Sequence, residues 1–270
     1  MPELPEVETI KNELLPRVVG QSFTKATILD SKLAHDGSIE EFHNGLIGQE
    51  IEKLKRRGKY LIFQLSNGQS LIIHFRMTGA LLLNPQENSP YTRAVFHLSD
   101  GSQLVFNDPR RLGLIWLGDD ESIIGKLGPE PLDGYFTPAV LQEVLATHQI
   151  PIKAALLDQS IVAGIGNMYA DEALFTAGIH PLRRTDILSD KEIDVLCHSI
   201  KTVLKAAIDN KGASVDTYIR PEGQQGAAQS SFKVAHRKGE SCLTCGTIIE
   251  RIPVRNRGSY FCPCCQPETT

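Results

Sequence analysis

Residues 242–265 read CLTCGTIIERIPVRNRGSYFCPCC and hold two Cys-x2-Cys pairs separated by sixteen residues. Four thiolates in two close pairs match the ligands of a tetrahedral zinc site on a β-ribbon finger. Four cysteine ligands leave no open coordination position, so we predict one structural Zn²⁺ held by Cys242, Cys245, Cys262 and Cys265. Cys264 is ambiguous, because it either stays an idle thiol or competes with Cys265.

Basic residues gather beside these cysteines although the chain as a whole is acidic. The net charge is −4, which weighs weakly against a nucleic-acid partner, but residues 201–260 contain ten Lys or Arg against five Asp or Glu. Between the cysteine pairs, Arg251, Arg255 and Arg257 fit either a solvated face or, beside a zinc ribbon, contacts to phosphates. A basic face of this kind still allows docking on a phosphate backbone.

Size and composition indicate a globular protein of about two domains. The chain has 270 residues, 41% of them hydrophobic and 22% charged. No apolar run approaches the roughly 20 residues that span a bilayer, and the acidic start lacks a signal core. Five of the six cysteines fall in the last thirty residues, which argues against a disulfide framework. We therefore expect a cytoplasmic protein without a membrane partner, with Cys197 in a core.

The N-terminal part combines one helical pattern with several strand patterns. Residues 5–19 predict a helix that Gly20 ends, since its apolar residues share one face: Val7, Ile10, Leu14 and Val18. Asn67-Gly68 and Asp100-Gly101 predict two hairpins, with strands at 60–65, 70–75, 94–98 and 103–106. A further strand is predicted at 112–117. The expected architecture is one helix plus an antiparallel β-sandwich or barrel.

Helical patterns replace strand patterns after residue 124. Gly and Pro break both periodicities at 125–136 and predict a linker. Thr137 with Pro138 opens a helix, and a capping box at Ser189 opens another that runs to Asn210. Short helices are expected at 152–157 and 168–176. The fold class is α+β, with a β domain at 1–124, a hinge at 125–136, a helical domain at 137–234 and a zinc finger at 235–270.

The first residues, Met1-Pro2-Glu3-Leu4-Pro5-Glu6-Val7-Glu8, have two interpretations. Removal of Met1 would make Pro2 a secondary amine that attacks an electrophilic carbon and forms an iminium, with Glu3 close enough to move a proton. An amine terminus titrates near ~8, so part of it is unprotonated at neutral pH. The alternative is an ordinary helix start, because proline with Glu6 and Glu8 nearby is a common first turn.

The turn Gly164-Ile165-Gly166-Asn167 precedes a short helix. Glycines let a phosphate approach the backbone, and a helix start supplies free N–H groups and a partial positive charge. Lys153, one short helix earlier, is placed to face the same phosphate. An ordinary helix–helix connection has the same composition, so the motif is weak alone.

Two further segments combine arginine with apolar side chains on expected turns. They are Asn107-Asp108-Pro109-Arg110-Arg111-Leu112 and His74-Phe75-Arg76-Met77-Thr78-Gly79. Paired arginines on a turn fit plain solvation, but a protruding Arg, Met and Leu would also fill the hole that remains when a base leaves a duplex. Lys59 would neutralise a phosphate beside Pro2, unless it merely flanks a strand.

Taken in order, these motifs resemble the bacterial formamidopyrimidine-DNA glycosylase family, from Pro2 to Cys265. Besides the N-terminal residues and the four-cysteine finger, the resemblance is carried by Arg57-Gly58-Lys59-Tyr60-Leu61, His74 with Met77-Thr78-Gly79, Asp108-Pro109-Arg110-Arg111, Leu127-Gly128-Pro129-Glu130-Pro131-Leu132, Gly164-Ile165-Gly166-Asn167 with Tyr169-Ala170, and Ala177-Gly178-Ile179-His180-Pro181. It implies a β-sandwich and a helix–two-turn–helix domain with a zinc finger, holding duplex DNA between them. The implied activity is excision of oxidised purines (8-oxoguanine and formamidopyrimidines), followed by strand cleavage through β,δ-elimination. We expect a monomer.

The resemblance also implies roles for individual residues. Pro2 attacks C1′ of an everted nucleotide and leaves a Schiff base, Glu3 helps to open the sugar ring, and Glu6 supports the N-terminal geometry. Lys59 and Arg257 contact phosphates and take part in strand cleavage. We expect further DNA contacts from His74, Met77, Thr92, Arg110, Leu112, His148, Lys153, Gly166 and Asn167. Of these, Met77, Arg110 and Leu112 fill the gap and inspect the opposite base.

Several positions depart from the family pattern. Leu112 stands where phenylalanine is usual, Thr92 where histidine is common, and His148 where lysine is usual, while Ala235-His236-Arg237 replaces a frequent Tyr-Gly-Arg. These changes bear on lesion preference, opposite-base choice and affinity. They leave the expected nucleophile and the zinc ligands untouched.

Two other functions stay open at this point. An endonuclease VIII-like enzyme would excise oxidised pyrimidines, and a non-catalytic zinc-finger protein would only bind damaged DNA. Residues 220–229, with Gly223 and Gly226, resemble the loop that covers an everted purine, although their short polar residues also fit disorder. This loop and the Leu-Gly-Pro-Glu-Pro linker favour the purine enzyme.

Overall fold

The computed structural model describes residues 1–87 and 89–268. Contacts divide the chain into two compact units. Unit 1 comprises residues 1–126 and 210–229, and unit 2 comprises residues 127–209 together with the C-terminal part from Ser230 onward. Among the described residues, no helix combines the length and the apolar character needed to cross a bilayer.

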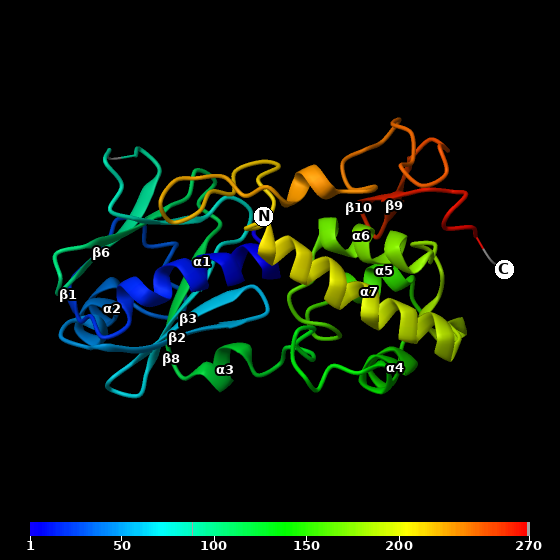
Figure 1. Cartoon of the computed structure of the whole chain (residues 1–270). Coiled ribbons are helices and arrows are strands. Elements are labelled where there is room, and N and C mark those ends of the chain that lie inside the picture. Colours follow the sequence, from blue (N-terminus) through cyan, green and yellow to red (C-terminus); the bar gives the residue numbers. More distant parts are fainter. Residues whose placement is uncertain (88, 269–270) are drawn as a thin grey trace. The chain divides into compact units, whose positions relative to one another are not determined.

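Two antiparallel four-stranded sheets and one long helix, α1 (Leu4–Val18), form most of unit 1 (Figure 1). One sheet has the order β1 (Phe23–Ile28), β6 (Thr92–Leu98), β7 (Gln103–Asn107), β5 (Ala80–Leu83). The other has the order β2 (Ile51–Arg57), β3 (Tyr60–Leu65), β4 (Ser70–His74), β8 (Leu114–Gly118). Two short helices, α2 (Ile39–Leu46) and α3 (Asp120–Ile124), complete the unit. The predicted α+β class with an antiparallel N-terminal domain is confirmed.

A single apolar cluster joins both sheets to α1. It contains the predicted face of the helix and inward residues from each sheet, among them Phe63, Ile73, Phe96 and Phe106. Both predicted hairpins form, since β3 pairs with β4 around Asn67-Gly68 and β6 pairs with β7 around Asp100-Gly101. The predicted helix at 5–19 is α1, shifted by one residue at each end. The cluster fixes the start of α1 against the sheets.

Residues 210–229 belong to unit 1, whereas the sequence placed them in the helical domain at 137–234. The physical reason is a set of contacts with α1 and β5. The Tyr218 ring joins the core of unit 1, and Arg220 forms an ion pair with Glu13, with 2.6 Å between Nη2 and Oε1. The Leu83 N–H donates to the Pro221 carbonyl at 2.8 Å. This segment therefore packs against the N-terminal unit.

The described residues of unit 2, 127–209 and 230–268, form four α-helices and a two-stranded ribbon (Figure 1). The helices are α4 (Pro138–Ala146), α5 (Ile152–Leu157), α6 (Asn167–Ala177) and α7 (Asp190–Asp209), and the ribbon pairs β9 (Glu250–Val254) with β10 (Arg257–Phe261). A 3-10 turn, η1 (Thr185–Ile187), precedes α7, and a second one, η2 (Ala228–Ser231), spans the point at which the chain passes from unit 1 to unit 2. α6 packs on α7 and on β10, so it links the helices to the ribbon. The predicted helices at 152–157 and 168–176 correspond to α5 and α6.

Candidate active site and phosphate-binding surface

The N-terminal turn of α1 is buried, and a carboxylate holds it in place. Glu3 is the N-cap residue, and its N–H donates to Glu6 Oε2 at 2.7 Å. The exposed fractions are 2% for Glu3 and 0% for Glu6, and Pro2 is also buried. The helix-start interpretation is therefore confirmed as a local structure. It is compatible with chemistry at Pro2, because the same turn fixes Glu3 directly beside that nitrogen in the chain.

A second contact of Glu6 ties this turn to residues 210–229. Its Oε1 accepts the Ala213 N–H at 2.8 Å, across 207 residues of sequence. Gly212 has φ +76°, and a Cβ added there would lie 2.9 Å from Glu6 Oε1, so glycine is needed on both counts. An acid without exposure is stabilised here by two backbone donors. Glu6 thus clamps the chain start onto the core of unit 1.

Lys59 and His74 lie at the ends of neighbouring strands of one sheet. Gly58 and Lys59 form the two-residue turn between β2 and β3, and Lys59 is 6% exposed. The turn is fixed to α1 because Arg56 Nε donates to Glu8 Oε2 at 2.7 Å. Burial, helped by the nearby charges of Arg76 and Lys59, lowers the pKa of His74 to about 3.

His74 is therefore a neutral hydrogen-bond donor at physiological pH. Its Nδ1 accepts the Arg76 N–H at 3.1 Å, so the ring proton resides on Nε2. The Tyr60 ring packs edge-on against it, with 4.7 Å between centroids. An uncharged imidazole with a fixed tautomer can donate to a phosphate or base without titrating near pH 7.

We predict that His74 makes folding stability fall on acidification. Between pH of about 3 and 6.5 the unfolded chain binds a proton at His74 that the folded chain does not. The free energy of unfolding should lose up to about 1.4 kcal/mol per pH unit in that window from this residue. Urea unfolding of the wild type and His74→Gln at pH 7 and pH 5 measures the difference. The free energy of unfolding should fall more between pH 7 and pH 5 in the wild type than in His74→Gln. An equal fall in both proteins would contradict the lowered pKa of His74.

The loop after β7 is organised by the buried carboxylate of Asp108. Asp108 Oδ2 accepts the N–H groups of Leu112 and Gly113, each at 2.7 Å, and Oδ1 accepts the Arg110 N–H at 3.1 Å. The Thr78 hydroxyl donates to the same carboxylate. Arg110 and Leu112 consequently project from a rigid turn, and Leu112 is 41% exposed. A side chain of this kind is able to enter a gap in a duplex.

The side chains of Met77 and Thr92 are both partly buried. The Met77 side chain is half-buried, and its carbonyl accepts the Thr217 hydroxyl at 3.5 Å. The Thr92 hydroxyl donates to Asn107 Oδ1 at 2.8 Å, so it supports the β6–β7 pair. A DNA contact by Thr92 would have to use the remaining acceptor capacity of that hydroxyl.

In unit 2, the expected glycine turn meets the ribbon. Gly164 has φ +85°, and its N–H donates to Gln159 Oε1 at 2.9 Å. Asn167, the first residue of α6, donates from Nδ2 to the Gly258 carbonyl at 3.0 Å. Its Oδ1 is buried and has no partner among the described residues. Because Gly258 follows Arg257 in β10, one exposed arginine lies next to a helix start, an arrangement suited to a phosphate.

Lys153 lies inside unit 2, whereas the sequence placed it facing a phosphate. Its ammonium is 0% exposed and forms an ion pair with Asp171. It also donates to the Asn167 carbonyl at 3.4 Å. Burial raises the pKa of Asp171 to about 7, although Lys153 opposes that shift. Lys153 therefore supports the start of α6 from within.

His148 follows α4 and is half-buried. Its carbonyl accepts the Thr185 hydroxyl at 2.6 Å, which joins this loop to η1. The hydrogen bond from the Ser160 hydroxyl lowers the pKa of the nearby Asp158 carboxyl, and His148 makes a smaller contribution in the same direction. Asp158 belongs to the segment before the glycine turn, so the structure places His148 beside that segment, and a DNA contact by His148 stays a prediction.

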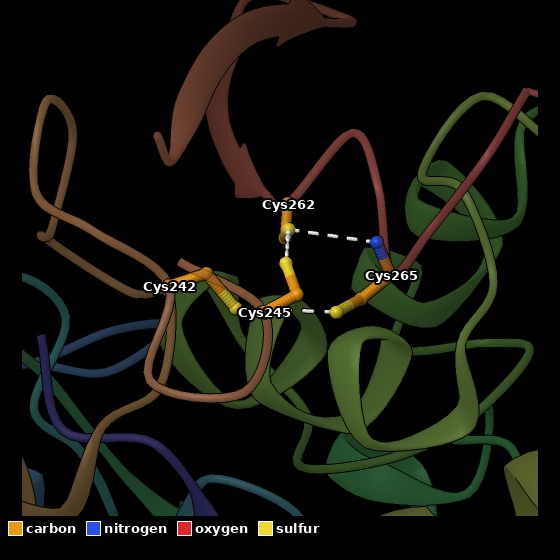
Figure 2. Close-up of side chains that lie close together, drawn as sticks. All are labelled: Cys242, Cys245, Cys262 and Cys265. Carbon is orange, nitrogen blue, oxygen red and sulfur yellow. Dashed lines mark hydrogen bonds between the residues drawn. The ribbon is translucent and has the colours of Figure 1, made fainter. Parts of the chain in front are cut away.

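Four cysteines converge at the base of the ribbon (Figure 2). Their sulfurs lie within 4.8 Å of one another, with 3.4 Å between Cys245 and Cys262 and 3.9 Å between Cys242 and Cys265. Zn–S bonds of about 2.3 Å in a tetrahedron place sulfurs about 3.8 Å apart, so the set fits one zinc ion. Cys264 is exposed and outside the cluster, which assigns it to the idle thiol. The predicted structural zinc site is confirmed.

Glu172 was not identified from the sequence, yet it attaches the segment before the finger to α6. Its buried carboxylate accepts the N–H groups of Lys233, Val234 and Ala235 at 2.8 to 3.0 Å. Gln266 makes a matching attachment at the far end, donating to the Ile179 carbonyl at 2.8 Å. The sequence signal is faint, because a glutamate in a helix normally faces solvent. Together these contacts hold Arg257 in place relative to Asn167.

Comparison with known proteins agrees with this geometry. Three family models match in order: the formamidopyrimidine-DNA glycosylase N-terminal domain at residues 1–115, the formamidopyrimidine-DNA glycosylase H2TH domain at 127–218, and a zinc finger found in FPG and IleRS at 239–267. The formamidopyrimidine-DNA glycosylase of Chloroflexus aurantiacus is 43% identical over 98% of both chains. That of Geobacillus kaustophilus is 43% identical over 98% of this chain and 100% of its own.

Solved structures extend the match to three dimensions. A Lactococcus lactis FPG variant in complex with DNA containing Fapy-dG superimposes with a TM-score of 0.92 at 35% identity, covering 99% of this chain and 100% of that one. The L. lactis Fpg bound to DNA with an abasic site has a TM-score of 0.91 at 35% identity, covering 98% and 100%. Both neighbours were therefore captured with damaged DNA.

Proposed function

Because this chain belongs to the formamidopyrimidine-DNA glycosylase family, we propose that it excises oxidised purines from duplex DNA in base-excision repair. It then cleaves the strand at the resulting abasic site. The observation that carries the proposal is the buried N-terminal turn, in which Glu6 fixes Glu3 beside Pro2. A nucleophile and a proton donor are thereby adjacent at the chain start.

The reaction begins after Met1 is removed. The Pro2 nitrogen attacks C1′ of the everted nucleotide, and the bond from C1′ to the damaged base breaks, so that the base leaves with the bonding electrons. The C1′–O4′ bond then breaks with its electrons going to O4′, which Glu3 protonates, and the lone pair of the proline nitrogen forms the C=N bond of the iminium. β- and δ-elimination then release the strand ends. Eversion costs a few kcal/mol and is least costly at a damaged pair.

The remaining site residues bind and shape the duplex. Lys59, Asn167 and Arg257 contact phosphates, and Lys59 and Arg257 also take part in strand cleavage. His74 donates from its neutral ring, and Gly166 admits a phosphate to the start of α6. Met77, Arg110 and Leu112 enter the gap, while Thr92 and His148 border the bound strand. Lys153 acts through Asn167, because its ammonium is buried under that turn.

The partner is double-stranded DNA with an oxidised base, and the protein acts as a monomer in the bacterial cytoplasm. The finger holds one structural Zn²⁺ through its four cysteines. The metal supplies local folding energy and takes no part in the chemical steps, since four protein ligands leave no open position.

A panel of duplexes tests this function. Each duplex carries one lesion, either 8-oxoguanine, a formamidopyrimidine or an oxidised pyrimidine, opposite each normal base. The protein is incubated with each duplex in the presence of borohydride to trap the adduct, and without borohydride to measure turnover. Covalent adducts and faster turnover on the purine lesions are expected. Faster turnover on pyrimidines would identify an endonuclease VIII-like specificity. Binding without an adduct on every lesion would identify a non-catalytic binding protein.

A further inference from the structure

Arg111 lies between the two residues that enter the DNA gap, and its backbone is unusual. Its φ is +56°, in the left-handed region that side chains with a Cβ rarely adopt. The flanking residues Arg110 and Leu112 are exposed. Their directions are set by the backbone conformation of Arg111, because a change in its φ would rotate one neighbour relative to the other.

An acid from a distant strand end holds this conformation. Asp30, two residues after β1, accepts Arg111 Nε at 2.5 Å and Arg111 Nη2 at 2.8 Å, which is a bidentate pair. Asp30 is 6% exposed, while the Arg111 side chain is 51% exposed. The guanidinium thus bends back onto a buried carboxylate, although it could have been fully solvated.

Further contacts make Asp30 a fixed reference point for the loop. The Lys32 N–H donates to Asp30 Oδ1 at 3.2 Å. Arg93 lies 3.9 Å from Asp30 Oδ2 and donates to the Asp108 carbonyl at 3.0 Å. The loop is therefore held from within by the Asp108 carboxylate and from its outer side by Asp30. The hydrogen bond from Arg111 also lowers the pKa of Asp30, which keeps it ionised at neutral pH.

We propose that Asp30 positions Arg110 and Leu112 for opposite-base discrimination by holding Arg111 in the left-handed conformation. This inference rests on the proposed function, in which those two side chains enter the duplex. Asp30 itself contacts neither DNA nor the reacting atoms. Replacement of Asp30 leaves the nucleophile intact. It lets the backbone of Arg111 change conformation, so that Arg110 and Leu112 no longer keep the directions that distinguish one opposite base from another.

Single-turnover excision at saturating enzyme measures this effect. The lesion excised fastest in the panel is placed opposite each of the four bases, and the ratio between the fastest and slowest pairs is recorded. In Asp30→Asn this ratio should fall by about five- to tenfold, while the rate on the fastest pair changes by less than about twofold. Arg111→Gly should narrow the ratio similarly, because glycine keeps the backbone conformation accessible but removes the tether.

The double variant decides whether Asp30 acts through Arg111. Adding Asp30→Asn to Arg111→Gly should narrow the ratio no further, whereas additive losses would overturn the proposal. Asp186→Asn is the matched control, since Asp186 also forms a bidentate pair, with Arg184, in unit 2. It should leave the ratio unchanged.

The outcomes separate this inference from the proposed function. An unchanged ratio in Asp30→Asn, with adduct formation intact, would refute the role of Asp30 alone. A wild type that shows no difference among opposite bases would also refute it. A wild type that forms no adduct on any lesion would refute both. If Asp30→Asn does not fold, Arg111→Gly carries the test.

Discussion

A protein carrying an N-terminal extension before Pro2 should form no borohydride-stable adduct with lesion DNA. Its excision rate should be lower than that of the processed chain by on the order of a thousandfold or more. The reason is that the nitrogen of an internal proline is part of an amide, so its lone pair is delocalised and unable to attack C1′. Removal of the extension by a protease that leaves Pro2 as the first residue should restore both activities in the same preparation.

The helix-start interpretation predicts the opposite result. If Pro2 and Glu6 only begin α1, the extension should leave excision unchanged, because the Glu3 N–H and the Glu6 carboxylate are still present. Thermal unfolding and zinc content should match before and after cleavage, which excludes misfolding as the cause of inactivity. Adduct formation by the uncut protein would show that another residue is the nucleophile, and the proposed mechanism would then be wrong.

Features with local causes were predicted correctly from the sequence. Asn67-Gly68 and Asp100-Gly101 each permit the backbone of a tight hairpin turn, and both hairpins are present. The apolar period of residues 5–19 marks the buried face of α1. Likewise, the spacing of the cysteines by itself brings four sulfurs to one point. In each case the residues that determine the structure are close together in the chain.

Features with distant causes were not predicted. β2 was not predicted as a strand, because its buried residues Ile51 and Leu54 stand three positions apart among charged residues and break the alternation of a strand. Residues 210–229 join unit 1 through contacts such as that of Ala213 with Glu6, 207 residues away. A pattern in the neighbouring residues cannot predict a contact with a residue so distant in the chain. Their composition of glycine and short polar residues therefore suggested a loose loop rather than an ordered segment.

Charge gave the least reliable guide to individual site residues. Lys153 was expected to face a phosphate because it lies one short helix before the glycine turn, but its ammonium is buried and pairs with Asp171, eighteen residues further on. Arg110 and Arg111 look equivalent in sequence, yet only Arg111 has an acidic partner among the described residues, Asp30. Their separate roles depend on Asp30, which lies 81 positions before Arg111 in the chain.

Zinc removal is expected to have the other large effect. The buried apolar core of the finger is small: one cluster joins the ligands Cys242 and Cys262 to Val234 and Ile249, and the described ribbon adds Val254 and Phe261. Apolar burial on this scale cannot offset the conformational entropy of a ribbon, so the metal must supply the folding energy, about 10–16 kcal/mol for structural zinc in finger peptides. Chelation should weaken binding of lesion DNA by at least about a hundredfold, since Arg257 then loses its fixed position.

Hydrogen exchange should show that this loss is confined to the finger. After chelation, amides of β9 and β10 should lose protection, while those of β3 and β4 should keep it, because their core contains no cysteine. Cys262→Ser should reproduce the chelated state, and Cys264→Ser should retain zinc and full DNA affinity, since Cys264 lies outside the cluster. Restoring Zn²⁺ should recover both ribbon protection and binding. Tight binding by metal-free protein would mean that contacts such as those of Glu172, Gln266 and Asn167 hold the ribbon without the metal, and the role assigned to the metal would then be wrong.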